Sequence, residues 1–397
     1  MKNNFRSTCN VCGSNELIEI IDLGEQPNAD NFLKESDLDT KETYYPLIMD
    51  RCKKCGHMQN KIKVKSEDRY SKIEYSYTSD NSLVSQKHFR ELAEYAVDEC
   101  YLDKNSFVIE PGSNIGTLIS AIKEISNSEI LGIDPSPNVS TLANQRGINT
   151  KCSFFNEESV RGIENVDLII GCNVLNHMDN PGEIFSAANL CLKSNGSIIV
   201  EVPCGDELLN NCYFDTIYHE HVNYFNKYSL ALLGVAWGYK LEKIKLVDYM
   251  GGSLRAVFRK DEKARIEDID LISNYILLNE NNINEFRSRV FSFKERLTKE
   301  LNRINSENDT KIFCLGAATK GNTLLNFLNL NSAIIQGIGD TMPLKHNKYT
   351  PGSRIKIFDE EYVLNDATHI YILPWNLTEL ISTKINEYGK SIIKITP

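Results

Sequence analysis

The same local unit occurs twice in this chain, and it constrains the fold class. Each unit is a short apolar strand, a glycine turn and a helix, followed by a second strand that ends in an acidic residue. In FVIEPGSNIGTL, Asp134 follows Gly112 by 22 positions; in IFCLGAATKGNTLL, Asp340 follows Gly316 by 24. Strands and helices that alternate in this way imply a parallel, doubly wound sheet with ligands at the carboxyl ends of its strands. We therefore predict an α/β protein with two Rossmann-like domains.

The first glycine turn predicts a site for a nucleotide-type ligand, because glycines let the backbone approach a ligand and an acid at the next strand end suits ribose hydroxyls. Both NAD and S-adenosylmethionine fit this layout. The turn lacks G-x-G-x-x-G and begins with Glu110, which favours S-adenosylmethionine, whose ammonium a carboxylate can meet. A domain of this type without a cofactor is the alternative. The residues expected at the cofactor are Glu110, Gly112, Ser113, Asn114, Gly116, Asp134 and Asn173.

Two CxxC pairs near the start predict a zinc site. Cys9 with Cys12 and Cys52 with Cys55 can each wrap two thiolates around one face of a metal, which completes a tetrahedral site. Four thiolates leave no open position, so this zinc is expected to be structural. The 39 residues between the pairs leave room for an inserted hairpin. Unligated thiols or a redox CxxC are the alternatives, and His57 is expected to be structural or exposed.

Composition disfavours several classes of protein. The 397 residues carry a net charge of −10 and no long basic run, which disfavours nucleic-acid binding. No segment reaches the roughly 18 consecutive apolar residues of a membrane span, and MKNNFRSTCN contains no apolar signal core. Abundant Asn, Ile and Lys indicate the base bias of a bacterial genome. We expect a monomer in the cytoplasm, where the eleven cysteines are thiols or metal ligands rather than disulfides.

The stretch FDTIYHEHVNYF concentrates titratable side chains that neither helix nor strand patterning requires. It places Tyr218, His219, Glu220 and His221 in succession, in the segment that follows the strand expected at 197–202. Because ligands of open α/β sheets bind beyond the carboxyl ends of strands, this cluster should lie over the cofactor edge. His177 follows the preceding strand and is expected at the same edge.

Three further segments offer candidate ligand contacts. Tyr75 and Tyr77 either line a pocket or anchor a linker. The GGSLR stretch either approaches an anionic group or forms a turn between strands. A lysine at the second glycine turn lies at a helix N-terminus, a natural site for phosphate or carboxylate, unless it is only a solvated surface lysine. The candidate substrate-binding residues are Gly252, Ser253, Arg255, Lys320 and Asn322. Helices connecting the two α/β units are expected over residues 264–306.

Taken together, these motifs resemble the C-methyltransferases of deoxysugar biosynthesis, which act on nucleotide-linked 4-keto sugars. The resemblance covers essentially the whole chain. Besides the CxxC pairs it is carried by LGEQPNADNF, IEPGSNIGTL, NVLNH, DTIYHEHVNYF, GGSLR, ATKGNTLLN, YTPGS and LPWN. It implies a zinc-binding module at 1–80, an S-adenosylmethionine-binding methyltransferase domain with the catalytic loop at 81–260, and a helical connector with a second Rossmann-like domain at 261–397.

The resemblance also implies a reaction: methyl transfer to the carbon next to the keto group, usually C3 of the hexose. A base must remove a proton alpha to the ketone, a donor must hold the enolate oxygen, and the methyl group must be positioned in line. By the family's motif, His221 maps to the base and Tyr218 to the residue that orients the keto oxygen. Supporting positions map to Glu220, His177 and a tyrosine of the Tyr75/Tyr77 pair, while His219 is expected to be structural.

The chain departs from the family's usual pattern at four positions. Ile115 stands where an acidic residue is usual, Pro111 where Ile or Val is common, Met250 where His precedes Gly-Gly-Ser, and Asp30 where Asn is common. These departures bear on the details of donor binding and on the sugar. Two other functions are weighed against methyl transfer: a nicotinamide-dependent oxidoreductase acting on a nucleotide sugar, and a non-catalytic zinc-containing binding protein.

Overall fold

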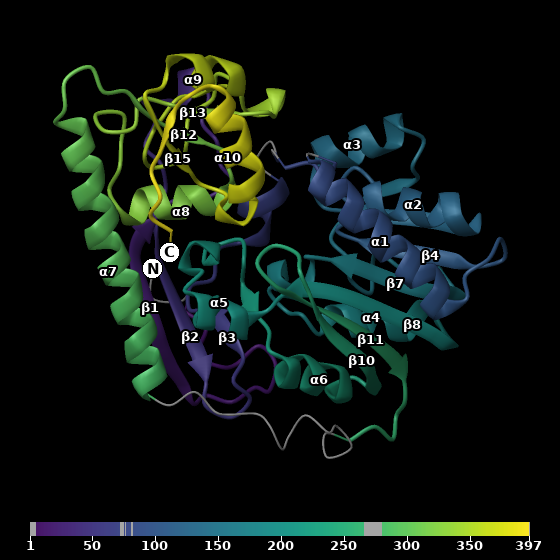
Figure 1. Ribbon diagram of the computed structural model, residues 1–397. Helices are drawn as coiled ribbons and strands as arrows, with labels where there is room; N and C mark the ends of the chain where they lie inside the picture. Colours follow the sequence, from purple (N-terminus) through teal and green to yellow (C-terminus); the bar gives the residue numbers. More distant parts are fainter. Residues whose placement is uncertain (1–4, 72–74, 76, 81, 266–279, 397) are drawn as a thin grey trace.

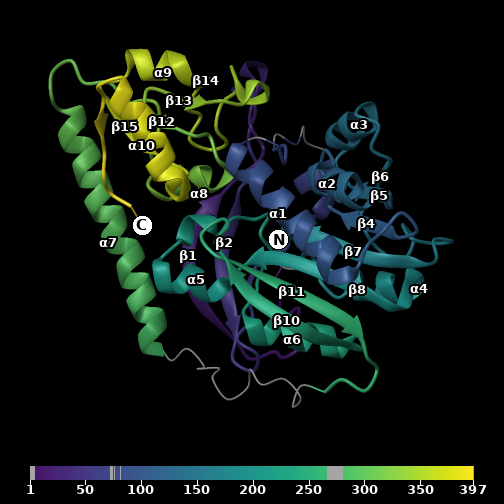
Figure 2. The same cartoon turned by 45° about the vertical axis from the view of Figure 1, so that its right-hand side comes forward.

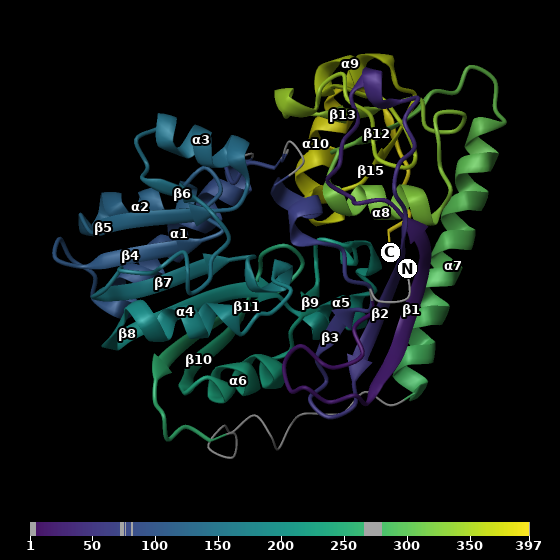
Figure 3. The same ribbon diagram turned by 180° about the vertical axis from the view of Figure 1, so that it is seen from behind.

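This computed structural model describes residues 5–71, 75, 77–80, 82–265 and 280–396. Within these residues the strands form three sheets (Figure 1). The N-terminal sheet is antiparallel and consists, in spatial order, of β1 (Leu17–Gln26), β2 (Tyr45–Cys52), β3 (Met58–Asn60) and β9 (Asn223–Tyr224). β1 and β2 form the hairpin expected between the CxxC pairs. β9 comes from a distant part of the sequence, so this sheet also holds the end of the FDTIYHEHVNYF stretch (Figure 3).

The central sheet has seven strands. In spatial order they are β10 (Tyr239–Val247), β11 (Ser253–Lys260), β8 (Leu192–Pro203), β7 (Val166–Cys172), β4 (Phe107–Pro111), β5 (Glu129–Asp134) and β6 (Thr150–Cys152). The strands from β8 to β6 are parallel, as predicted. β11 is antiparallel to both β10 and β8, so the sheet is mixed rather than wholly parallel. The reason is the tight turn at Gly251–Gly252, which joins β10 and β11 as a hairpin without a crossover helix.

The C-terminal sheet is parallel throughout and confirms the second α/β unit. In spatial order it consists of β14 (Ile357–Asp359), β13 (Ile338–Asp340), β12 (Ile312–Leu315), β15 (His369–Ile372) and β16 (Ser391–Ile392). Asp340 ends β13 as Asp134 ends β5, and each carboxylate accepts hydrogen bonds from the glycine turn of its own domain. The repeated unit of the sequence is therefore a repeated local structure.

Helices cover the sheets and connect them (Figure 1). With the central sheet are α1 (Leu83–Cys100), α2 (Thr117–Ser126), α3 (Pro137–Gln145), α4 (Glu183–Cys191) and α6 (Lys227–Ala236). A further helix, α5 (Gly205–Asn211), buries Leu208 and Leu209 in the core shared by the N-terminal and C-terminal sheets. With the C-terminal sheet are α8 (Thr319–Phe327), α9 (Glu360–Asp366) and α10 (Thr378–Glu387). The short helices are η1 (Glu35–Asp37), η2 (Glu67–Ser71), η3 (Leu175–His177), η4 (Phe214–Thr216), η7 (Pro343–Lys345) and η8 (Trp375–Leu377). None of the described helices is both long and apolar enough to cross a membrane.

A long helix, α7 (Glu280–Asn305), packs the N-terminal and C-terminal sheets into one core (Figure 2). It is the described part of the connector expected over 264–306; residues 266–279 lie outside the described residues. Phe293 of α7 is fully buried in one cluster with Ile21 of β1 and Phe327 of α8. Burying a side chain of this size stabilises the fold by about 1.5–3 kcal/mol. The first and last parts of the chain therefore fold as one body.

The four cysteines of the CxxC pairs come together below the N-terminal sheet. Cys9 Sγ lies 3.5 Å from Cys55 Sγ, and Cys12 Sγ lies 3.5 Å from Cys52 Sγ. All four sulfur atoms lie within 4.8 Å of one another. Tetrahedral zinc with Zn–S bonds of about 2.3 Å needs S···S separations of roughly 3.8 Å. The donor set and its spacing fit a structural zinc ion.

We expect Cys52→Ser to reduce bound zinc from about one ion per chain to near zero and to lower Tm by several degrees. The physical reason is that metal-binding free energy is part of the folding free energy of such a module. Metal analysis of the purified protein and calorimetry measure the two effects. Cys152→Ser, which changes an exposed cysteine, is the matched control. Unchanged zinc content in Cys52→Ser would contradict the assignment of the site.

Candidate active site

The glycine turn after β4 lies at the carboxyl edge of the central sheet and is tied to Asp134. The Asp134 carboxylate accepts hydrogen bonds from the N–H groups of Asn114 at 2.9 Å and Ser136 at 2.8 Å. At Gly116 φ is +81°, and a Cβ there would lie 2.7 Å from the Ile148 side chain, so only glycine fits. Strand, turn, helix and acid are thus assembled as the sequence predicted.

Residues 77–79 contact this turn, and two polar atoms near the turn have no hydrogen-bond partner among the described residues. The Asn114 side chain accepts from the Ser79 N–H at 3.0 Å and donates to the Tyr77 carbonyl at 3.1 Å. Ser113 Oγ and Asn173 Oδ1 are buried and have no hydrogen-bond partner among the described residues. Buried polar atoms are normally paired, so these two fit a ligand with polar groups, such as the donor expected here.

Glu110 is hydrogen-bonded to the helix that follows the glycine turn. Its carboxylate accepts a hydrogen bond from the Ile119 N–H of α2 at 3.1 Å, and burial raises its pKa well above the usual value. Gly112, two positions later, has φ of +62°, and a Cβ there would lie 3.0 Å from Val174. The Glu110 carboxylate therefore joins the end of β4 to α2, and its contact with the cofactor stays a prediction.

The loop of residues 214–225 brings a histidine and a tyrosine into direct contact. The backbone N–H of His221 donates to the backbone carbonyl of Tyr218 at 3.0 Å, which closes a tight turn. Across this turn the Tyr218 hydroxyl lies 2.5 Å from Nε2 of the His221 ring. His221 Nδ1 lies 3.1 Å from the Thr216 carbonyl, which can only accept, so Nδ1 carries the proton and Nε2 accepts. Burial lowers the pKa of His221 to about 3, and the imidazole is therefore neutral at neutral pH.

His177, the last residue of η3, packs against this pair. Its ring lies 4.8 Å from the His221 ring, edge to face. Burial, and then the repulsion that would arise if both rings were protonated, lowers the pKa of His177 well below the usual value. His177 Nδ1 lies 2.6 Å from the Tyr70 hydroxyl, and the Tyr75 ring lies 5.9 Å from the Tyr70 ring. The structure thus brings Tyr75 to this cluster, while Tyr77 lies at the glycine turn.

Tyr70 was not predicted from the sequence. It lies in KSEDRYSK, where charged residues surround one aromatic residue and no motif marks it. The only signal in the sequence that points to Tyr70 is its nearness to Tyr75.

The two middle residues of the YHEH string point to different surroundings. Glu220 is fully buried and accepts a hydrogen bond from the Asp30 N–H at 3.1 Å. Burial, and then the charge of Asp30, raises the pKa of Glu220 to about 8. His219 lies with Nε2 3.4 Å from the Pro46 carbonyl and its ring edge-on to Tyr45, and burial lowers its pKa to about 4. His219 and His221 therefore serve different parts of the structure.

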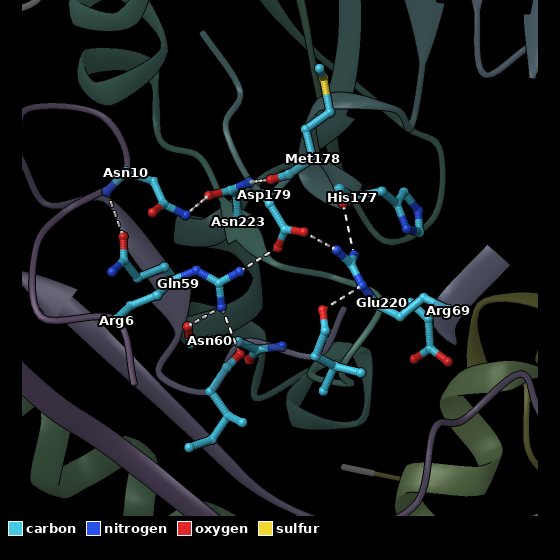
Figure 4. A network of polar contacts seen from close by, with 12 residues as sticks. Arg6, Asn10, Gln59, Asn60, Arg69, His177, Met178, Asp179, Glu220 and Asn223 are labelled. Carbon is cyan, nitrogen blue, oxygen red and sulfur yellow. Dashed lines mark hydrogen bonds and ion pairs between the residues drawn. The ribbon is translucent and has the colours of Figure 1, made fainter. Parts of the chain in front are cut away.

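An ion-pair network fixes η3 from the side of the N-terminal module (Figure 4). Asp179 accepts from Arg6 at 2.5 Å and from Arg69 at 2.7 Å. Arg69 also donates to the His177 carbonyl at 2.9 Å. Both arginines are almost completely buried, whereas Asp179 is partly exposed. The backbone that carries His177 is thus held by a charged group of the N-terminal module.

Two asparagines fix the loop that carries His221. The Asn60 amide, at the end of β3, donates to the carbonyls of Tyr218 and His221 at 2.7 and 2.8 Å. Asn223, on β9, accepts from His57 Nε2 at 3.1 Å. His57 is fully buried next to the cysteine cluster, as one of the two expectations for it stated. The zinc-binding module therefore contacts the loop through Asn60 on β3 and through the hydrogen bond between His57 and Asn223 on β9.

The predicted residues of the β10–β11 hairpin are engaged within the protein. Arg255 Nε donates to Glu201 Oε2 at 2.7 Å, and both side chains are buried. Ser253 donates its hydroxyl to the Tyr249 carbonyl at 3.0 Å. Gly252 lies in the turn with φ of +109°. GGSLR is thus a turn between strands, the second of the two interpretations given for it, and its arginine neutralises a carboxylate of this chain.

Lys320 and Asn322 lie at the start of α8. The Lys320 ammonium lies 3.8 Å from the Trp375 ring centroid and donates to Asn376 Oδ1 at 2.5 Å. Burial lowers the pKa of Lys320 to about 8. Asn322 donates to the Ala29 carbonyl at 2.7 Å and so joins α8 to the N-terminal module.

Comparison with known families matches three models along the chain. Residues 9–70 match "Putative zinc binding domain", residues 85–244 match "Methyltransferase domain", and residues 248–396 match "C-methyltransferase C-terminal domain". The C-methyltransferase NovU of Streptomyces niveus is 28% identical over 403 aligned positions, which cover 98% of this chain and 95% of NovU.

Solved structures are similar over less than half of this chain. The plantazolicin methyltransferase BpumL in complex with SAH is 15% identical, covers 46% of this chain and 87% of its own, and has a TM-score of 0.39. Magnesium protoporphyrin IX methyltransferase from Synechocystis PCC 6803 with bound SAM is 13% identical, covers 44% and 79%, and has a TM-score of 0.35. At TM-scores this low, neither likeness carries an argument about this chain.

The family matches decide between the donors that the glycine turn left open, in favour of S-adenosylmethionine over a nicotinamide cofactor, and they favour an enzyme over a binding protein. With its cysteine cluster, mixed central sheet and parallel C-terminal sheet, the chain belongs to the S-adenosylmethionine-dependent C-methyltransferases that combine an N-terminal zinc-binding domain, a central methyltransferase domain and a C-terminal C-methyltransferase domain.

Proposed function

We propose that this C-methyltransferase acts on a nucleotide-linked 4-keto-deoxysugar and methylates the carbon next to the keto group, C3 of the hexose. The observation that carries the proposal is the contact of 2.5 Å between the Tyr218 hydroxyl and a neutral His221 Nε2. A keto sugar presents an acidic C–H and a carbonyl oxygen side by side, and this pair offers a base and a donor at the matching separation. The motifs shared with deoxysugar C-methyltransferases point to the same substrate class.

His221 acts as the base in this proposal. Its Nδ1–H stays bonded to the Thr216 carbonyl, which fixes the ring and leaves the Nε2 lone pair for the substrate's alpha proton. The low pKa keeps Nε2 unprotonated before the reaction. When Nε2 takes the proton, the bonding pair of the C–H bond becomes the enolate, and the imidazolium and the enolate stabilise each other as opposite charges in a buried site.

Tyr218 holds the oxygen. Its hydroxyl proton, which points at His221 Nε2 in this structure, turns to the keto oxygen when substrate is present, and this movement frees Nε2. Burial, and then the charge of Asp30, raises the pKa of Tyr218 well above its usual value, so the hydroxyl stays protonated and donates. His177 and Tyr75 enclose the same space with neutral side chains. A donor aimed at the developing oxyanion lowers the barrier to proton removal.

Donor binding is assigned to the edge of the central sheet. Asp134 and the turn from Gly112 to Gly116 would hold the nucleoside, and Ser113 and Asn173 offer buried polar atoms without partners among the described residues. Bound S-adenosylmethionine supplies an electrophilic methyl group on its sulfonium. For the nucleotide end of the sugar we assign Lys320, a half-buried cation at the N-terminus of α8, which suits a phosphate.

Incubation of the enzyme and S-adenosylmethionine with a panel of nucleotide-linked sugars should add one methyl group to 4-keto sugars and none to their 4-hydroxy counterparts. Only a ketone makes the neighbouring C–H acidic enough for a histidine base. Mass spectrometry of the products measures the gain. Methylation of a sugar without a keto group, or of none in the panel, would contradict the substrate class.

His221→Asn should reduce exchange of the substrate's alpha proton with solvent deuterium about 100-fold or more, the usual size of general-base catalysis. NMR of the sugar measures this step without methyl transfer, and calorimetry should show unchanged donor binding. His219→Gln is the matched control, because His219 contacts the Pro46 carbonyl instead. Wild-type exchange rates in His221→Asn would exclude it as the base.

Asp179→Asn should slow the same exchange about tenfold and lower the free energy of unfolding by about 1–3 kcal/mol, because it leaves two buried guanidinium groups without their carboxylate. The value is smaller than for a fully buried pair since Asp179 is 42% exposed. Donor affinity should not change. Asp366→Asn, at the exposed pair with Lys311, is the control. Loss of stability with full exchange activity would show that the network does not position His177.

A further inference from the structure

A second carboxyl group lies beside Glu220. Asp30, in the segment between β1 and β2, donates its backbone N–H to Glu220 Oε1 at 3.1 Å. Asp30 is 4% exposed and Glu220 is 0% exposed. Two buried acidic side chains on neighbouring residues of the fold are rare, since each costs free energy when ionised unless other groups stabilise its charge.

Asp30 has groups that stabilise its negative charge. The hydroxyl of Thr319, the first residue of α8, donates to Asp30 Oδ1 at 2.5 Å. Burial raises the pKa of Asp30, while this hydroxyl and the ammonium of Lys345 lower it. Lys345 is itself buried, with its ammonium bonded to the Ala317 carbonyl.

Glu220 lacks such groups. Its Oε1 accepts the Asp30 N–H, and the backbone N–H of Glu220 itself is a second donor that lowers its pKa. Its buried Oε2 has no hydrogen-bond partner in the part of the chain that the structure describes. The cation next to it, Arg69, directs its guanidinium to the carbonyls of Val64 and His177 and to Asp179. An ionised Glu220 would therefore be a buried charge that, within the described residues, backbone N–H groups alone stabilise through hydrogen bonds.

From these contacts we propose that Asp30 and Glu220 share one proton at neutral pH, with Asp30 ionised and Glu220 a neutral acid. Two like charges close together in a buried site oppose the ionisation of both groups, and the member with a hydroxyl donor and a nearby ammonium keeps the charge. Asp30 is thus a positioning residue that acts through Glu220. Neutral Glu220 presents Oε2–H as a hydrogen-bond donor, and its use by a sugar oxygen rests on the proposed function.

Other titratable groups around the pair do not change this assignment. Those that face it are neutral at neutral pH except for the cations Arg69 and Lys345. They come from η2, the segment after it, the loop itself, β9 and η7: Arg69, Tyr70, Tyr75, Tyr218, Tyr224 and Lys345. The tyrosines all have pKa values raised by burial.

The direction of the pH dependence follows from the raised pKa of Glu220, about 8. A group that must be protonated supports activity below its pKa and loses that support as pH rises through it. Removing the charge of Asp30 makes Glu220 easier to ionise. The alkaline limb of the activity profile should therefore move to lower pH.

The test is carbon-13 NMR of the full-length, zinc-loaded protein labelled at glutamate carboxyl carbons, with the Glu220 signal identified by its loss in Glu220→Gln. In the wild type the signal should titrate near pH 8. In Asp30→Asn the midpoint should fall by about one pH unit or more, a tenfold or greater loss of proton affinity. The pH profile of substrate deuterium exchange is recorded in parallel.

Three further variants serve as comparisons. Thr319→Val removes the hydroxyl from Asp30, moves the shared proton towards Asp30 and should lower the Glu220 midpoint by a smaller amount. Thr319→Ser keeps a hydroxyl and should restore the wild-type midpoint. Asp39→Asn changes an exposed acid of the same segment and should have no effect. Thr319→Val also provides the test if Asp30→Asn does not fold.

An unchanged Glu220 midpoint in Asp30→Asn and in Thr319→Val would overturn the proposal. A purely structural role for Asp30 would lower the exchange rate equally at every pH without moving the midpoint, and that result would overturn it too. If the midpoint moves but the exchange profile does not follow, the shared proton stands and the role of Glu220 in the proposed reaction fails.

Discussion

The structure depends on the pairing of β9 with β3, which ties the loop of Tyr218 and His221 to the zinc-binding module. The loop has little regular structure of its own, and the Asn60 amide holds the two carbonyls that set its turn. From the other side, Asp179 and Arg69 hold the backbone of His177. The zinc-binding module, whose four thiolates leave no coordination position for a substrate, thus fixes the geometry of the reactive side chains. The C-terminal domain packs into the same core through α7.

Burial gives this site its chemical character. Inside a low-dielectric space neutral groups cost less than charged ones, so His177 and His221 are held as free imidazoles and Tyr218 as a hydroxyl. The full charges at the site are compensated: Asp179 by two guanidinium groups, Glu201 by Arg255, and Asp30 by the Thr319 hydroxyl and the Lys345 ammonium. Such a site is nearly neutral before the reaction and stabilises the charges that form during proton removal. Interactions that are stronger in the transition state than in the ground state are the ones that raise the rate.

Local patterns in the sequence predicted the parts of this structure that depend on short-range chemistry. The CxxC pairs and both glycine turns with their acids lie where those patterns placed them. Tyr70, Asn60, Arg6, Arg69 and Asp179 carry no motif, because their roles arise from contacts between segments far apart in the chain. Arg255 shows the converse: its position after a Gly-Gly-Ser turn suggested a ligand contact, but the tertiary structure places a buried carboxylate opposite it. The antiparallel edge of the central sheet was missed because a hairpin can replace a crossover helix without changing the strand pattern.

The central claim is that burial and the Thr216 carbonyl keep His221 as a neutral imidazole protonated at Nδ1, ready to act through Nε2. Nitrogen-15 NMR of the histidine rings, with His221 assigned from the spectrum of His221→Asn, measures both the charge and the tautomer. We expect one neutral Nδ1–H tautomer for His221 across roughly pH 6–8, where an ordinary histidine titrates. An imidazolium at pH 7, or a neutral ring with its proton on Nε2, would contradict it.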